Sequence, residues 1–242
     1  MKSLTKLAAL AASVLLVPSI SAADPAAAPA KAAKPAAAKP AAAAPTAAAT
    51  PAAPAAVAAP AKAEVGKAAP EFALKDLNGK EVKLSSLKGK TVVLEWFNPG
   101  CPYVKKSHTV GSLVDTAKRQ TKNGVVWLAI NSGAPGKQGN ELALNTEAVK
   151  TWSLEHPVLR DESGTVGKAY GATNTPHMFV IDKKGTLVYA GAIDNSPDGE
   201  GKSAEGGKLV NYVDAALSDL AASKPVAVPT SKAYGCGVKY GS

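Results

Sequence analysis

The chain has 242 residues, a formal net charge of +9, two cysteines and three histidines. Part of the positive charge lies in an N-terminal tail, so the charge by itself does not indicate a nucleic-acid site. The cysteines and histidines show no metal-ligand spacing, and neither a haem-attachment motif nor a phosphate-binding glycine loop occurs, so we expect no metal and no cofactor.

Residues 1–23 have the three parts of a secretory signal peptide. Two early lysines precede a short apolar stretch broken by Pro18, and the small residues Ser21 and Ala23 have the spacing that signal peptidase prefers. The apolar stretch is shorter than the ~20 residues that span a bilayer comfortably. We therefore expect cleavage near Asp24 and export to the periplasm or the extracellular space; an uncleaved anchor is the alternative.

Residues 24–64 consist almost wholly of alanine and proline, with lysines at 31, 34, 39 and 62. This composition offers no large side chains to bury, and the recurring prolines interrupt any alanine helix. The sequence predicts a disordered, extended linker. Its lysines suggest a loose association with an anionic envelope surface, although a solvated tether is the simpler interpretation.

The remaining residues, 65–242, are enough for one domain with a sizeable core. The pattern alternates strands and helices, which predicts an α/β fold with a mixed central sheet flanked by helices. The expected elements are short strands around Asn78-Gly79, a buried strand at 91–97, a helical stretch from Cys101 to about 123, a strand at 125–132, a helix at 146–156, an extended piece at 156–163, a short helix at 165–171, a hairpin at 177–194, a flexible loop at 196–208 and a helix at 209–222.

Cys101 occupies a position that favours a reactive thiol. It follows the apolar strand 91–97 and precedes Pro102, which suits the first position of a helix and makes Cys101 the N-cap. The helix N-terminus and the nearby Lys105 both favour a thiolate. His108 continues the same helix face, although a surface histidine is the simpler interpretation for it.

Two segments, VVLEWFNPGCPYVKK and NTPHMFVIDKKGTLVYAGAID, make the chain similar to the thioredoxin-like superfamily. More narrowly, it resembles the peroxiredoxin-like branch known as redoxin or alkyl hydroperoxide reductase/thiol-specific antioxidant. The resemblance covers about Val65 to Tyr240, and the tail TSKAYGCGVKY resembles the glycine-cysteine ending of some of these proteins. It implies a thioredoxin-like fold and redox chemistry at a cysteine.

By this resemblance Cys101 takes the place of the first cysteine of C-x-x-C, and Val104 stands where the second would be. Thr175 and Pro176 match the cis-proline segment that, with Pro102, forms the substrate groove. Glu95 matches the buried carboxylate that moves protons to and from the sulfurs, and burial would raise its pKa. The alternative for Glu95 is a carboxylate at a strand edge, paired with a lysine.

The chain departs from the peroxiredoxin motif P-x-x-x-T-x-x-C. Leu94 and Asn98 replace its proline and threonine, and the later arginine is absent from the region of Asn174. Those residues polarise the peroxide, so their absence weakens the case for a dedicated peroxidase. Asn98 retains the ability to donate a hydrogen bond to a peroxide or sulfenate oxygen.

Cys236 is the other cysteine of the chain, and glycines flank it on both sides. Export makes a disulfide with Cys101 plausible, and a reversible resolving role suits this pair better than a permanent crosslink. An intermolecular bridge and a free tail thiol are the alternatives. The deciding condition is that the two Cα atoms lie within ~7 Å.

The sequence therefore supports an exported thiol-dependent oxidoreductase. The Cys101 thiolate would attack a peroxide, giving a sulfenic acid, or a protein disulfide, giving a mixed disulfide, and an external thiol would supply the electrons. The alternative is a non-catalytic thioredoxin-fold module, tethered in the cell envelope, whose groove near Pro176 binds extended peptides.

Overall fold

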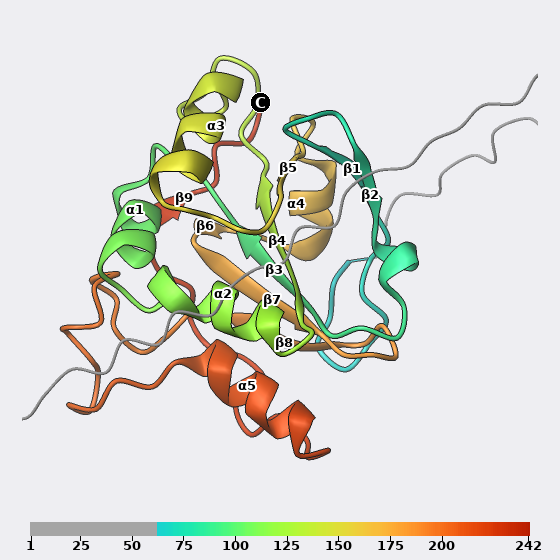
Figure 1. Cartoon of the computed structure of the whole chain (residues 1–242), viewed down its shortest axis with the longest axis vertical. Helices are drawn as coiled ribbons and strands as arrows, with labels where there is room; N and C mark the ends of the chain where they lie inside the picture. Colours follow the sequence, from blue (N-terminus) through green and yellow to red (C-terminus); the bar gives the residue numbers. More distant parts are fainter. Residues whose placement is uncertain (1–61) are drawn as a thin grey trace, which may run out of the picture. The chain divides into compact units, whose positions relative to one another are not determined.

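The structure is a computed structural model, and it describes residues 62–242; the expected signal peptide and nearly all of the expected linker lie outside this range. Figure 1 shows the elements in chain order. They are β1 (Ala73–Asp76), β2 (Glu81–Lys83), the 3-10 turn η1 (Leu84–Leu87), β3 (Val92–Trp96), α1 (Pro102–Thr109), α2 (Leu113–Lys122), β4 (Val126–Asn131), α3 (Leu142–Thr151), β5 (Val158–Arg160), α4 (Thr165–Tyr170), β6 (Asn174–Thr175), β7 (His177–Ile181), β8 (Leu187–Gly191), α5 (Tyr212–Ala221) and β9 (Cys236–Gly237).

Seven strands form one mixed sheet in the order β2-β1-β5-β4-β3-β7-β8. The central strand β3 runs parallel to β4 and antiparallel to β7, and all five of its residues are buried. A near-continuous apolar run is the sequence signature of a strand covered on both faces. The mixed α/β sheet and the thioredoxin-like arrangement expected from the sequence are confirmed.

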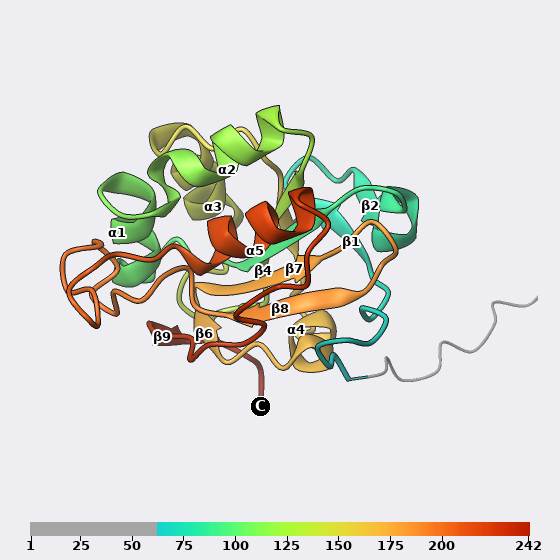
Figure 2. The ribbon, with the colours of Figure 1, turned by 90° about the horizontal axis from the view of Figure 1, so that it is seen from below.

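Helices cover both faces of the sheet. Helices α1, α2, α3 and α5 lie over one face, and α4 lies over the other, on the side where β6 and β9 pair (Figure 2). Trp96 packs against Phe179 and Tyr170 on the α4 side. Trp127 and Met178 belong to the core on the α2 and α5 side. Successive side chains along β3, β4 and β7 point to opposite faces of the sheet. This alternation fixes which helices each side chain packs against.

The long helix expected after Cys101 is interrupted, which corrects that expectation. α1 ends at Thr109 and α2 begins at Leu113, with Gly111 between them. A Cβ atom at Gly111 would lie 2.2 Å from the carbonyl oxygen of Gly199, so the chain breaks where the 196–208 loop crosses it. The Ser112 hydroxyl hydrogen-bonds to Asp194 at the same crossing.

The helix expected at 146–156 is displaced toward the N-terminus, because α3 spans Leu142–Thr151. Ser153 follows it with a φ of +53°, a left-handed conformation that ends the helix. The 196–208 segment contains no helix or strand, as expected, and its Asp198 carboxylate accepts hydrogen bonds from the backbone of Glu200 and Gly201 at 2.7 and 3.0 Å.

The segment after α5 returns across the molecule instead of ending there. Thr230 bridges to Ala190 on β8, and β9 then pairs antiparallel with β6. The sequence did not predict these two short strands. Within residues 62–242, no helix has the length and apolar character needed to cross a membrane.

Candidate active site

Cys101 lies at the carboxyl end of β3 and caps α1. Pro102 occupies the first turn of the helix, and the backbone of Cys101 is extended, as the N-cap position requires. The predicted N-cap is therefore confirmed. The helix N-terminus presents unpaired N–H groups and the positive end of its dipole toward this residue, which favours a negative charge on sulfur.

The Cys101 thiol contacts the chain at the proline segment expected from the sequence. Its Sγ atom donates a hydrogen bond to the carbonyl oxygen of Thr175 at 3.0 Å. The Thr175-Pro176 peptide bond is cis, as the resemblance implied. Residues far apart in the sequence, one following β3 and one preceding β7, thus meet at the same end of the sheet.

Strand β9 brings the second cysteine to this place. Cys236 is the register partner of Thr175, and Asn174 pairs with Gly237. The Asn174 side chain donates to the carbonyl oxygen of Gly235 at 3.1 Å, which adds a side-chain contact to the short ladder. Both cysteines are free thiols, and Cys236 packs against the buried cluster that contains Cys101.

The two thiols have opposite acidities. Burial raises the pKa of Cys101, but hydrogen bonds from the side chains of Cys236 and Thr175 and from the backbone of Val104 outweigh it, so the pKa lies below its ordinary value. Burial raises the pKa of Cys236 to about 11, and its hydrogen bond to Cys101 acts in the same direction. Of the two thiols, Cys101 is therefore the one that loses its proton first.

Glu95 is completely buried on β3, which corrects the alternative of a strand-edge carboxylate paired with a lysine. Its carboxylate lies 2.7 Å from Nε2 of His108 and accepts a hydrogen bond from Nε1 of Trp127 at 3.2 Å. His108 is 5% exposed, so the simpler interpretation of a surface histidine is wrong. The predicted rise in pKa is also wrong: burial raises the pKa of Glu95, but His108 outweighs burial and lowers it.

The side chain of Asn98 bonds to the backbone of two loops, its own and the one that contains Gln138. Its Oδ1 accepts a hydrogen bond from the N–H of Gly100 at 2.8 Å, and its Nδ2 donates to the carbonyl oxygen of Gln138 at 3.1 Å. The carbonyl oxygen of Asn98 accepts from the N–H of Cys101 at 3.0 Å. The contacts of Asn98 therefore shape the turn that leads into α1.

The other two residues predicted at the site lie on the exposed side of α1. Pro102 is exposed at the first turn, and Lys105 is exposed one turn later, where its backbone N–H donates to the carbonyl oxygen of Cys101 at 3.0 Å. The groups with the largest influence on the pKa of Cys101 are Cys236, Thr175 and backbone N–H groups.

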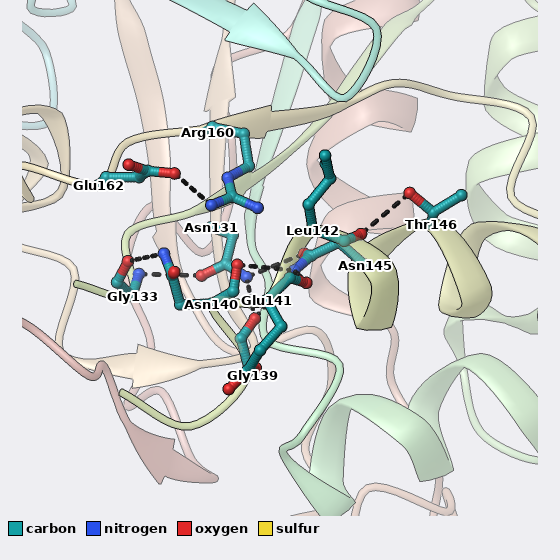
Figure 3. Close-up of polar contacts among 10 residues, drawn as sticks. All are labelled: Asn131, Gly133, Gly139, Asn140, Glu141, Leu142, Asn145, Thr146, Arg160 and Glu162. Carbon is teal, nitrogen blue, oxygen red and sulfur yellow. Dashed lines mark hydrogen bonds and ion pairs between the residues drawn. The ribbon is translucent and has the colours of Figure 1, made fainter. Parts of the chain in front are cut away.

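A network of asparagines, for which no sequence motif provided a signal, links the end of β4 to the loop before α3 and to α3 itself (Figure 3). Asn131 donates to the carbonyl oxygen of Gly139 at 2.8 Å and to Oδ1 of Asn145 at 2.9 Å. Asn145 itself donates to the same Gly139 oxygen at 2.9 Å. This network fixes the loop that presents Gln138 to Gly100, whose carbonyl oxygen accepts from the Gln138 side chain at 3.0 Å.

Comparison with known proteins places these features in a family. A family model described as Redoxin matches residues 64–207, a span that ends before Cys236. Thiol-disulfide oxidoreductase ResA of Bacillus thuringiensis subsp. konkukian is 33% identical over 128 residues, which cover 52% of this chain and 69% of that protein. ResA of Bacillus subtilis is 32% identical over 123 residues, covering 51% and 64%.

Two solved structures are similar over most of the described range. A hypothetical protein of Sinorhizobium meliloti 1021 has a TM-score of 0.65 at 27% identity, covering 76% of this chain and 98% of its own. An uncharacterized conserved protein of Geobacillus kaustophilus has a TM-score of 0.64 at 29% identity, covering 74% and 93%. Because the family model matches more than half of its residues, this chain belongs to the Redoxin family.

Proposed function

We propose that the protein is a thiol-disulfide oxidoreductase whose redox pair consists of Cys101 and Cys236. The observation that carries the proposal is the pairing of Cys236 with Thr175, the residue whose carbonyl oxygen also binds the Cys101 thiol. Relatives named thiol-disulfide oxidoreductase ResA support the same reaction class.

The pair supplies what the missing C-x-x-C motif would supply. Val104 occupies the second motif position, so α1 offers no neighbouring sulfur, and β9 delivers one from the far end of the chain. In the net reaction the two thiols lose two electrons and two protons and form one disulfide. A substrate disulfide gains them and becomes two thiols, and an external thiol reverses the change on the protein.

Disulfide exchange fits the site better than peroxide reduction. Asn98 is the residue that would polarise a peroxide, and both ends of its side-chain amide are already hydrogen-bonded to Gly100 and Gln138. A thiol whose pKa is lowered, next to a second thiol whose pKa is raised, is instead the arrangement that thiol-disulfide exchange uses.

The same arrangement argues against a purely binding module. A peptide-binding groove has no need of a depressed cysteine pKa, yet the pKa of Cys101 lies below its ordinary value in a buried position. The Thr175 edge of the groove is moreover filled by β9. We therefore favour a catalytic role for Cys101 over a non-catalytic one.

We further propose that the protein is exported, on the strength of the leader at residues 1–23. An oxidising compartment would supply the partners that a reversible disulfide needs. Mass spectrometry of the mature protein is expected to find an N-terminus at Asp24. Recovery of the soluble protein with an intact Met1 would contradict export.

The experiment that tests the redox pair compares the wild type with Cys101→Ser and Cys236→Ser. After treatment with a model disulfide, the wild type is expected to remain a monomer and to lose both free thiols, with the crosslink found by peptide mapping. Each single variant is expected to stop at a mixed disulfide. A stable wild-type monomer that keeps one free thiol after oxidation would refute the pair.

A further inference from the structure

We propose that external thiols and disulfides exchange at Cys236, and that Cys101 acts as the internal sulfur of the pair. The inference rests on the proposed redox pair and assigns the order of events within it. It departs from the sequence-based hypothesis, in which Cys101 meets the substrate directly.

Access to the two residues is the first observation. Cys101 is 0% exposed, whereas Cys236 is partly exposed. The residues on both sides of Cys236 are glycines, which carry no side chains, and a Cβ atom at Gly237 would find its nearest neighbour 4.0 Å away. An external partner therefore meets Cys236 before it meets Cys101.

The backbone edge beside Cys101 is the second observation. β9 pairs with Thr175, and the N–H of Val238 donates to the carbonyl oxygen of Thr173 at 3.1 Å. A partner peptide that added a strand to β6 would have to remove β9 first, because a strand edge accepts one neighbour. The chain itself thus closes the direct route along the groove to Cys101.

Anchors on both sides of Cys236 are the third observation. The Tyr234 hydroxyl donates to Oδ1 of Asp194 at 2.8 Å, and the Tyr240 hydroxyl donates to the carbonyl oxygen of Ala172 at 2.7 Å. Between them, the N–H of Ala134 donates to the carbonyl oxygen of Lys239 at 2.9 Å. These contacts hold Cys236 at the surface of the site, so exchange there requires no displacement of the strand.

The chemistry of the leaving group favours the same order. When an external thiolate attacks Sγ of Cys236 in the Cys101–Cys236 disulfide, a new S–S bond forms to Cys236 and Cys101 leaves as a thiolate. That thiolate keeps the hydrogen bonds from Thr175 and from the backbone of Val104, which act to lower the pKa of Cys101. Attack at Cys101 would instead expel Cys236, whose pKa is raised by burial, so Cys236 is the poorer leaving group.

A second external thiolate then attacks the mixed disulfide, forms an external disulfide and releases Cys236, which takes up a proton. In the opposite direction, Cys236 loses its proton and attacks a partner disulfide, so a mixed disulfide forms on Cys236 and one partner sulfur leaves as a thiolate. The Cys101 sulfur, once deprotonated, then attacks Sγ of Cys236, forms the Cys101–Cys236 disulfide and releases the second partner sulfur as a thiolate. Both directions move two electrons between the protein pair and the partner, so the atoms and electrons balance.

The test begins with the oxidised wild type, whose disulfide is verified beforehand by peptide mapping. The protein is mixed with limiting glutathione, quenched with acid within milliseconds, alkylated with N-ethylmaleimide and digested. We expect glutathione on Cys236 and N-ethylmaleimide on Cys101, with a preference of ~10-fold or more over the opposite pattern. The opposite pattern, or equal labelling, would overturn the inference. Failure to form the disulfide at all would instead refute the proposed redox pair.

A second measurement uses the reduced single-cysteine variants and needs no disulfide. Cys101→Ser and Cys236→Ser each react with glutathione disulfide and with a disulfide-bonded small protein, and rate constants are normalised to the thiolate fraction of each variant. For Cys236 the protein disulfide is expected to react nearly as fast as glutathione disulfide. In the Cys236→Ser variant β9 still covers Cys101. The protein disulfide is therefore expected to react with Cys101 at least ~10-fold more slowly than glutathione disulfide does. Equal size dependence for both sulfurs would contradict the inference.

Discussion

The Sγ atom of Cys101 lies 3.0 Å from the carbonyl oxygen of Thr175, and Cys236 on strand β9 is the register partner of the same Thr175. Thr175 therefore contacts both cysteines. Its carbonyl oxygen accepts a hydrogen bond from Cys101, and its backbone pairs with Cys236. Cys236 lies near the C-terminal end of the sequence, on a strand of two residues.

The acidity of Cys101 is expected to depend on Cys236 and hardly on Lys105. Cys236→Ala removes the thiol that hydrogen-bonds to the Cys101 sulfur, so the pKa of Cys101 is expected to rise. Lys105→Gln removes an exposed charge that bulk water screens, and it serves as the control. The thiolate absorbance at 240 nm, followed against pH, measures both. A larger rise in Lys105→Gln than in Cys236→Ala would contradict the role given to Cys236.

The two glycines that flank Cys236 provide a matched pair for testing β9. Gly235 has a φ of +103°, and a Cβ atom there would lie 2.3 Å from the carbonyl oxygen of Thr175. Gly235→Ala is therefore expected to push β9 away from β6, at a cost of ~1–3 kcal/mol, and to slow formation of the Cys101–Cys236 disulfide. Gly237→Ala has room and should leave the rate nearly unchanged. Equal oxidation rates in the two variants would argue against the observed register.

The buried pair of Glu95 and His108 is expected to contribute strongly to stability only as a pair. Removing one partner leaves the other buried without its hydrogen-bond partner, so Glu95→Leu and His108→Leu are each expected to cost ~3–5 kcal/mol in the free energy of unfolding. The double variant is expected to cost clearly less than the sum of the two. Urea denaturation of the four proteins gives the coupling, and additive effects would mean that the pair does not interact.

The pH dependence of Glu95 has a definite sign. The pKa of Glu95 is lower in the folded protein than its ordinary value, because His108 outweighs burial. The folded state therefore holds this proton less tightly than the unfolded state. The contribution of Glu95 to stability is present above the unfolded pKa and is lost as the pH falls through the lower, folded value.

His156 is expected to destabilise the fold in mild acid. Burial lowers its pKa to about 4, and its buried Nε2 atom has no hydrogen-bond partner among residues 62–242. Since the unfolded histidine binds a proton near pH 6.5, about 3 kcal/mol of stability should be lost as the pH falls from about 6.5 to about 4. Urea denaturation at pH 7 and pH 5 is expected to show a smaller loss in His156→Gln than in the wild type. An unchanged difference between the two pH values would contradict this assignment.

The asparagine network is expected to affect both stability and reactivity. Asn145 is fully buried and bonds to Asn131 and to the backbone of Gly139, so Asn145→Ala is expected to cost ~1–3 kcal/mol and to loosen the loop against Gly100. The neighbouring Thr146→Ala, which removes an exposed hydrogen bond to the carbonyl oxygen of Leu142, is the control. Unfolding and the alkylation rate of Cys101 measure the two effects; equal behaviour would contradict the supporting role.

The sequence alone determined those features that depend on neighbouring residues. The apolar run at 91–97 predicted the buried central strand, and Pro102 after Cys101 predicted the N-cap, because strand burial and helix starts follow from local side-chain chemistry. The resemblance to a known family added the cis bond before Pro176. Together these residues specified one sulfur at the end of a strand.

The tertiary structure decided what depends on contacts between distant segments. The helix breaks at Gly111 because the backbone of Gly199 passes close to it. The pKa of Glu95 is lowered by its contact with His108 on α1. No local pattern encodes the pairing of Cys236 with Thr175, because a strand of two residues carries too little hydrophobic alternation to predict its partner. Its register comes from the tyrosine anchors and the close approach of Gly235, and these exist only once the whole domain has packed.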